Sequence, residues 1–235
     1  MAAEDSARQT GASRRSPPRT APSGGTASGP GRAVCLRGDG ARLAAGIRGR
    51  GETVLALHGL TASRALWRPL AERLPSGLAL LAPDLPARGE SPPAPDGRYR
   101  LRDELRRLRS ALASAGLRPR VVVGHSQGAA LAVALAATDP AVGALVLCSP
   151  VCPWTPRPPL LDLLRGAGPA ARRIVPALRR PVVRWVLRHR VYADPTRADG
   201  AAVDRYAAPW ASGERAAELP RILADWNPAA LWPYF

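Results

Sequence analysis

A single serine lies in a setting that could make it a nucleophile. Gly124-His125-Ser126-Gln127-Gly128 has the pattern G-x-S-x-G. An apolar run that predicts a strand, residues 120–123, precedes it, and a run of small apolar residues that predicts a helix, residues 129–137, follows it. A serine at a sharp strand-to-helix turn is held with its hydroxyl projecting, which is the arrangement called a nucleophile elbow. The sequence therefore predicts a nucleophilic serine at residue 126.

The residues around Ser126 suit such a turn. The serine needs strained backbone angles at this sharp turn. A side chain at Gly124 or Gly128 would collide with neighbouring backbone, which explains why both are glycine. The helix expected to begin at Gln127 directs its N–H groups and the positive end of its dipole at the place where an oxyanion would form. The motif therefore predicts both a nucleophile and part of the site that would stabilise a negatively charged intermediate.

Strands and helices around this motif are expected to position it. Uninterrupted apolar runs predict strands that are covered on both faces, and periodic leucines predict helices between them. This alternation indicates an α/β fold with a mostly parallel, doubly covered sheet. Gly38-Asp39-Gly40 predicts a hairpin turn between two further strands. The expected strands are residues 33–36, 43–47, 53–57, 78–82, 120–123 and 144–147, and the expected helices are residues 64–74, 101–115 and 129–137.

Three further features converge on the same kind of protein. His58-Gly59 follows the strand at 53–57, and Asp84 with Gly89-x-Ser91 follows the strand at 78–82. After residue 150 the strand pattern stops, and residues 153–220 consist of proline-interrupted helical pieces that predict a helical cap. With these residues, the sequence resembles the α/β-hydrolase family over residues 33–235, within its group of small cap-bearing serine hydrolases.

The resemblance implies roles for individual residues. Ser126 is expected to attack a carbonyl carbon and form an acyl-enzyme, while the backbone N–H groups of Leu60 and Gln127 bind the oxyanion. His58 is expected to organise the oxyanion loop rather than to act as general base. Members that open epoxides or displace halide carry aspartate at the nucleophile position, so those reactions are disfavoured. The expected substrate is a small-molecule ester, thioester, amide or related carbonyl compound, including one with an activated carbon–carbon bond. The supporting residues are His58, Gly59, Gly124, His125 and Gly128, and no cofactor is expected.

The general acid and base are not identified in this sequence. In the family the nucleophile is followed along the chain by an acid and then by a histidine. The only histidine after Ser126 is His189, between two arginines on an expected cap helix. Three hypotheses follow: a catalytically impaired fragment of a serine hydrolase, a working hydrolase with an unorthodox base such as His189 assisted by Asp194 or Asp199, and a non-catalytic binding protein. The expected organisation is a disordered basic tail at 1–32, a core at 33–152, the cap at 153–220, and a truncated return to the core at 221–235, with the C-terminal strands missing.

The composition limits the partners. The net charge is +16, yet all 34 basic residues are arginine, and they are scattered along the chain. This pattern is typical of GC-rich codon usage, so no nucleic-acid partner is expected. Residues 157–190 carry many arginines and one acid, Asp162. Solvated arginines are the simplest interpretation, and an anionic substrate or a lipid surface are the alternatives.

No apolar run could span a bilayer, and we expect a cytoplasmic protein. The cysteines, Cys35, Cys148 and Cys152, match no metal motif, and no metal is expected; they predict partly buried free thiols.

Overall fold

The computed structural model describes residues 31–156, residue 166 and residues 170–235. The tail expected at 1–32 therefore lies outside the described residues except for its last two. The same is true of cap residues 157–165 and 167–169. Within the described parts of the chain, no helix is long and apolar enough to cross a membrane.

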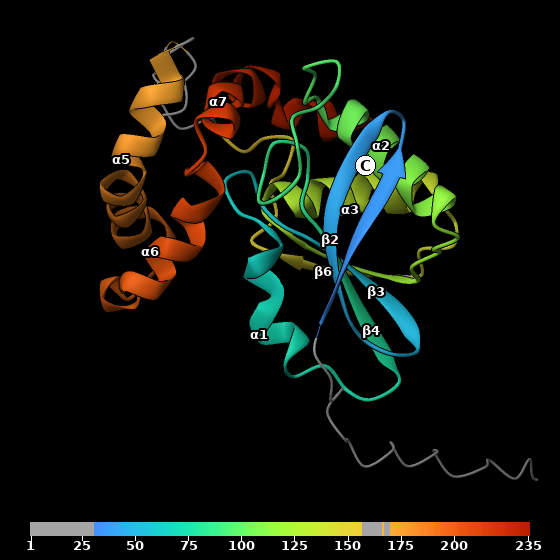
Figure 1. Cartoon of the computed structure of the whole chain (residues 1–235). Helices are drawn as coiled ribbons and strands as arrows, with labels where there is room; N and C mark the ends of the chain where they lie inside the picture. Colours follow the sequence, from blue (N-terminus) through green and yellow to red (C-terminus); the bar gives the residue numbers. More distant parts are fainter. Residues whose placement is uncertain (1–30, 157–165, 167–169) are drawn as a thin grey trace, which may run out of the picture.

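Six strands form one sheet in the order β1-β2-β4-β3-β5-β6 (Figure 1). The pairs β1–β2 and β2–β4 are antiparallel, and the pairs β4–β3, β3–β5 and β5–β6 are parallel. The expected mostly parallel sheet is thereby confirmed. The strands are β1 (Arg32–Gly38), β2 (Ala41–Gly49), β3 (Glu52–Leu57), β4 (Leu78–Pro83), β5 (Val121–His125) and β6 (Ala144–Cys148).

The expected hairpin joins β1 and β2. Its two turn residues, Asp39 and Gly40, have φ values of 48° and 71°. Positive φ at both central residues is the requirement of the tight hairpin turn whose twist matches that of the strands, and Asp-Gly meets it at low cost. The prediction from Gly38-Asp39-Gly40 is confirmed.

Helices cover both faces of the sheet, and alternate residues of β3 show how. Leu55 and Leu57 pack in one buried cluster with α2 (Leu101–Ser114) and α3 (Gln127–Thr138). Val54 and Ala56 point the other way and pack with Trp67, which belongs to the short helical segment before α1 (Arg68–Ala71). Because successive strand residues face opposite sides, both sets are buried only when both faces are covered. The doubly covered sheet is therefore confirmed.

The helix expected at 64–74 is shorter and less regular than predicted. A 3₁₀ segment covers Arg64–Trp67, and only Arg68–Ala71 is α-helical. Pro69 has no backbone N–H and cannot take part in a continuous α-helix that begins at residue 64. It is accommodated in the first turn of a new helix instead.

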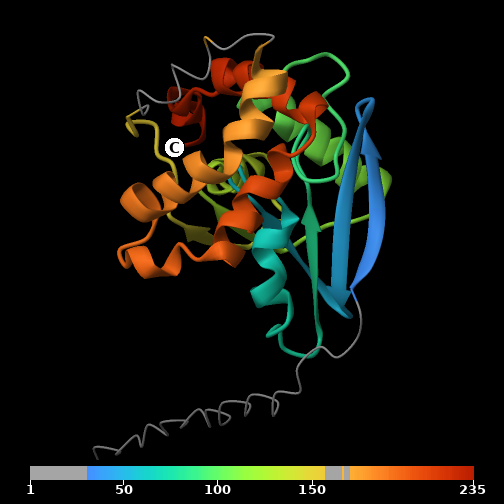
Figure 2. The same ribbon diagram turned by 60° about the vertical axis from the view of Figure 1, so that its left-hand side comes forward.

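The described residues of the segment expected to form a cap are mainly helical. Figures 1 and 2 both show α5 (Ala171–Val186) and α6 (Gly200–Ala207) outside the sheet, on the side away from the β1–β2 hairpin. A π-helical segment, Leu187–Val191, continues α5. Helix α7 (Gly213–Asp225) continues past residue 220, where the cap was expected to end. The terminal 3₁₀ segment Pro228–Tyr234 follows it. Trp226 and Leu231 are buried in the same cluster as α3, so the end of the chain packs on the core.

Strand β6 differs from the expectation of a buried strand. Its residues are all exposed, including Leu145, Val146 and Leu147 at 37%, 48% and 39%. The strand lies at the edge of the sheet and pairs only with β5 among the described strands. An apolar sequence is therefore not sufficient to predict burial, because burial also depends on neighbouring strands.

The expectation that the cysteines are partly buried holds only for Cys152. Cys35 and Cys148 are exposed, and all three are free.

Candidate active site

Ser126 occupies the turn between β5 and α3, as the G-x-S-x-G pattern predicts. Its φ and ψ are 54° and −115°, a positive φ that few residues other than glycine adopt. Its backbone N–H donates a hydrogen bond of 3.0 Å to the carbonyl of Cys148 at the end of β6. Strain of this kind persists only where the surrounding structure enforces it.

Three glycines allow the close packing around Ser126. A Cβ at Gly124 would lie 2.5 Å from Cα of Ala129, and one at Gly128 would lie 2.1 Å from the carbonyl oxygen of Leu57. Both distances are far below van der Waals contact, so these positions require glycine. A Cβ at Gly59 would lie 3.2 Å from Cβ of Ser126. The loop after β3 therefore lies directly against the serine.

His58 holds this loop and is not available for proton transfer. Its Nδ1 lies 2.8 Å from the carbonyl oxygen of Gly59, and its Nε2 accepts the N–H of Leu85 at 3.0 Å. These partners fix the neutral tautomer that carries its proton on Nδ1. Complete burial lowers the pKa of His58 from 6.5 to about 3. The side chain thus joins the loop after β3 to the loop after β4 as a neutral group.

Two backbone N–H groups near Ser126 lack acceptors. Gln127 is the first residue of α3, so its N–H has no partner within the helix. Leu60 follows Gly59 in the loop that contacts Ser126. Within the described ranges, neither Leu60 nor Gln127 has an acceptor for its backbone N–H. Unpaired backbone donors in segments next to a serine are suited to binding an oxyanion.

A cavity of about 520 Å³ opens at Ser126, which places it in the size range of small-molecule sites, ~300–1,000 Å³. The loop at residues 59–62, His125, Ser126 and Ser149 form its core side. Apolar residues of α5, such as Leu178 and Val182, form much of its cap side. The lining that the structure describes contains no carboxylate, and its only histidine is His125. The pocket is therefore mainly apolar.

The three histidines have separate surroundings, and none is paired with an acid. His125 lines the pocket; its Nδ1 is buried without a partner, and burial lowers its pKa. His189 is exposed, and its ring lies 5.3 Å from that of Trp185 instead of lining the pocket. The acids considered as its partners cap short helices: Asp194 accepts the N–H of Thr196, and Asp199 accepts that of Ala202.

A buried ionic network lies behind the loop after β3, and it was not predicted from the sequence. Arg88 and Glu104 form an ion pair of 2.5 Å with both side chains 0% exposed. The Arg88 guanidinium also donates to the carbonyl oxygen of Leu60 at 3.3 Å and to the side-chain oxygen of Gln127 at 3.2 Å. Gln127 donates in turn to Glu104. Burial raises the pKa of Glu104, and Arg88 opposes that rise. The network contacts both residues that supply the unpaired N–H groups.

One signal in the sequence could have indicated this network. Glu104 lies between Leu101, Leu105 and Leu108 on the apolar face of α2, where it must be buried with a partner. Nothing comparable marks Arg88 within its loop.

Asp84 organises its own loop. Its carboxylate accepts the backbone N–H groups of Arg64 and Glu90 and pairs with the Arg64 side chain. Gly89 has a φ of 53°, and a Cβ there would lie 2.3 Å from this carboxylate. Burial raises the pKa of Asp84, and its hydrogen bonds act against that rise. Among the described residues, no group of three or more His, Cys, Asp or Glu could hold a metal ion.

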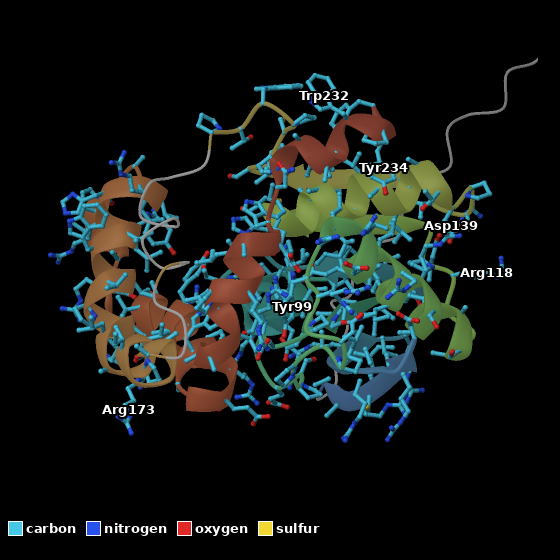
Figure 3. The ribbon with its side chains drawn as sticks, turned by 90° about the horizontal axis from the view of Figure 1, so that it is seen from above. Tyr99, Arg118, Asp139, Arg173, Trp232 and Tyr234 are labelled. Carbon is cyan, nitrogen blue, oxygen red and sulfur yellow. The ribbon has the colours of Figure 1, made fainter. Side chains whose placement is uncertain are left out.

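Three hydrogen bonds connect residues 210–225 to this side of the core. Trp210 donates its indole N–H to the carbonyl oxygen of Thr61, in the loop that lines the pocket. The hydroxyl of Tyr99 donates to Glu218 of α7 at 2.8 Å, and the backbone N–H of Tyr99 donates to Asp225 at 2.7 Å. Figure 3 shows Tyr99 between α7 and the core. The cap therefore packs on the loop that contacts Ser126.

Comparisons with known proteins agree with this architecture. Lipase LipV of Mycobacterium tuberculosis is 42% identical over 98 residues, which is 41% of this chain and 36% of that protein. The match thus spans about a third of the relative's length. Among solved structures, Cfl2 of Burkholderia cenocepacia has a TM-score of 0.66 at 25% identity, covering 85% of this chain and 73% of that one. The epoxide hydrolase CorEH has a TM-score of 0.69 at 19% identity, covering 83% and 74%, a likeness of fold alone.

The family itself is shown by a broader match. Residues 54–235, most of the chain, match the model of the alpha/beta hydrolase family. That range includes the loop after β3, the elbow at Ser126 and the described part of the cap. This chain belongs to the alpha/beta hydrolase family.

Proposed function

We propose that Ser126 is the nucleophile of a hydrolase that cleaves an ester or a related carbonyl substrate through an acyl-enzyme. The observation that carries this proposal is the geometry of the elbow. Ser126 lies at a strained turn beside an apolar cavity. Gln127 follows it directly, the loop that contains Leu60 lies against it, and the backbone N–H groups of both residues are unpaired within the described ranges. A nucleophile, a place for the carbonyl and two donors for the oxyanion are the elements that acyl transfer requires.

The chemistry proceeds in two steps. The Ser126 oxygen forms a bond to the carbonyl carbon, its proton leaves to a base, and the carbonyl oxygen becomes an oxyanion. The N–H groups of Leu60 and Gln127 bind that oxyanion, each contributing about 3 kcal/mol in comparable sites. The intermediate expels the alcohol or thiol, and water then hydrolyses the acyl-enzyme. Two supports hold the loop at residues 59–60 in place: His58 from one side and the Arg88–Glu104 pair from the other.

An apolar acyl group fits the pocket best. The cap side is built from aliphatic side chains such as Leu178, Val182 and Val186. Burial of such a chain is favourable by roughly 25 cal/mol per Å² of apolar surface. The partial match to a protein named as a lipase supports the same substrate class. A lipid-like ester is therefore the form of the proposal that we favour.

Labelling with a fluorophosphonate tests the nucleophile. The probe is added to the full chain with and without free imidazole, because the described pocket lining offers only His125 as an internal base. We expect labelling of the wild-type chain, accelerated by imidazole, and none in Ser126→Ala. Ser149→Ala is the matched control, since Ser149 also lines the pocket and also has a positive φ, of 45°. Labelling that survives in Ser126→Ala, or a folded wild-type chain that stays unlabelled under both conditions, would contradict the proposal.

A second candidate function is non-catalytic binding of an apolar ligand. The observation that favours it is the same described lining, which is apolar and has no acid–histidine pair near Ser126. Under this alternative, a fatty acid would bind with equal affinity to the wild-type chain and to Ser126→Ala, and neither would hydrolyse p-nitrophenyl esters faster than free imidazole does. Turnover that depends on Ser126 separates the two functions.

A further inference from the structure

The cap carries a basic helical segment that is distinct from the proposed catalytic residues. Residues 171–191, which form α5 and its π-helical continuation, contain seven arginines and no aspartate or glutamate. Large apolar side chains alternate with these arginines at helical spacing. The segment thus has the amphipathic, arginine-rich character of helices that lie at membrane interfaces. We call residues 171–191 the basic cap helix.

The apolar side of the basic cap helix is only partly covered. Ile174, Leu178 and Trp185 are 43%, 51% and 50% exposed. Their spacings of four and seven residues bring them to one side of the helix. A tryptophan beside aliphatic residues is typical of side chains that reside at a lipid–water boundary. Such a face is costly in water, where this apolar surface stays hydrated.

The arginines next to this face are available to a partner. Arg173, Arg184 and Arg188 are exposed, and none forms an ion pair with a described acidic residue. Figure 3 shows Arg173 at the periphery of the cap, pointing away from the rest of the molecule. Arg180 differs, because it pairs with Asp204 of α6. The unpaired guanidinium groups produce positive charge that is complementary to a phosphate-rich surface.

The combination of charge and apolar exposure selects one kind of partner. Nucleic acid would use the arginines but would leave aliphatic side chains such as Ile174 and Leu178 without a partner. A bilayer that contains anionic lipids engages both, since its headgroups attract the guanidinium groups and its acyl boundary accepts the apolar side chains. Ile174 and Leu178 also line the cavity that opens at Ser126.

We infer that the basic cap helix docks on an anionic lipid surface, with Trp185 and Leu178 at the acyl boundary and the unpaired arginines on the headgroups. Docking in this way places the cavity mouth at the membrane, where an apolar acyl substrate would enter directly. The docking itself does not depend on the proposed function, because binding to lipid requires no reaction at Ser126.

Vesicle sedimentation with the full chain tests this inference. The vesicles are phosphatidylcholine alone, or phosphatidylcholine with about a third phosphatidylglycerol, at low and physiological salt. We expect binding to the anionic vesicles, weakened by salt, and little binding to the neutral ones. Removing two arginines with Arg184→Gln and Arg188→Gln is expected to weaken partitioning about 30-fold, at roughly 1 kcal/mol for each guanidinium group.

Two matched controls separate specific docking from diffuse attraction to a chain of high positive charge. Arg102→Gln with Arg109→Gln removes the same charge from exposed positions of α2. Trp232→Ala removes a tryptophan that is 58% exposed, and Trp185→Ala removes one that is 50% exposed. The inference predicts that the changes in the basic cap helix weaken binding and that the controls leave it within about twofold of the wild type.

Several results would overturn the inference. Equal loss of binding from both arginine pairs would show attraction to net charge alone. Unchanged binding in Trp185→Ala, with no blue shift of wild-type tryptophan fluorescence on vesicles, would show that no apolar contact forms. Tighter binding to a 20-nucleotide RNA than to the anionic vesicles, sensitive to Arg184→Gln with Arg188→Gln, would assign the surface to nucleic acid instead. Fluorophosphonate labelling in each variant shows independently whether the active site remains intact.

Discussion

Arg88 of the core and two arginines of the basic cap helix, Arg184 and Arg188, have the same side-chain chemistry but different surroundings. Arg88 is fully buried against Glu104, and its donors reach Leu60 and Gln127. Arg184 and Arg188 of the basic cap helix are exposed and form no ion pair with a described acid. A composition in which every basic residue is arginine hides this difference. Burial and partners, rather than residue type, decide whether an arginine supports the fold or remains available for binding.

The difference has an energetic basis. A buried charge depends strongly on its partner, because removal of either member leaves the other charge in a medium of low polarity. An exposed guanidinium keeps its water, so its removal changes the folded and unfolded states almost equally. Substitution of Arg88 is therefore expected to lower the free energy of unfolding. Substitution of Arg184 or Arg188 is expected to change only the affinity for a partner.

Arg88→Met gives the largest expected effect. The substitution leaves Glu104 buried without its cation and removes a donor from Leu60 and from Gln127. We expect the free energy of unfolding, measured by urea titration of the full chain, to fall by about 3–5 kcal/mol. Fluorophosphonate labelling is also expected to slow, because the residues that carry the oxyanion donors lose a support.

The double variant Arg88→Met with Glu104→Leu is the control for that effect. It removes both charges, and replacement of a buried pair by apolar residues is often neutral or stabilising. We expect most of the lost stability to return while labelling stays slow. If the double variant is as unstable as Arg88→Met alone, the packing of Arg88, not its charge, dominates, and the contrast with the cap arginines fails.

The second prediction concerns pH and the neutral buried histidine of the core. In the folded chain the pKa of His58 is about 3, whereas its ordinary value is 6.5. Above pH 6.5 the group is neutral in both states, and below it only the unfolded chain binds the proton. Stability therefore falls as the pH falls from 6.5 towards 3, and at pH 5 His58 should account for a loss of about 2 kcal/mol. Urea titrations at pH 7 and pH 5 measure it.

His58→Gln isolates this contribution from that of other groups. The variant keeps an amide donor and acceptor but has no proton to gain in this range. We expect its stability to change by about 2 kcal/mol less between pH 7 and pH 5 than that of the wild type. Parallel pH dependence in the two chains would show that His58 is not the group responsible.

Local patterns in the sequence predicted much of the fold and the centre of the site. Asp39-Gly40 defines the hairpin because its requirement for positive φ is local, and the glycines beside Ser126 mark the elbow for the same reason. Long-range features were not predictable in this way. The exposure of Leu147 depends on which strands flank β6, and the burial of Arg88 depends on a partner on α2. The residues next to Leu147 and Arg88 do not indicate either relation, and only Glu104, on the apolar face of α2, signals the second.

The smallest expected effect completes the comparison, and it concerns Arg184 in the cap. Its side chain is exposed on α5 and forms no ion pair with a described acid, so Arg184→Gln should change the free energy of unfolding by less than about 0.5 kcal/mol. Glutamine has a helix propensity close to that of arginine, which removes secondary structure as a confounding cause. Urea titration beside Arg88→Met measures the contrast directly. A loss above about 1 kcal/mol would mean that the cap depends on Arg184 for its folding, and that exposure without an ion pair does not identify an arginine that is available for binding.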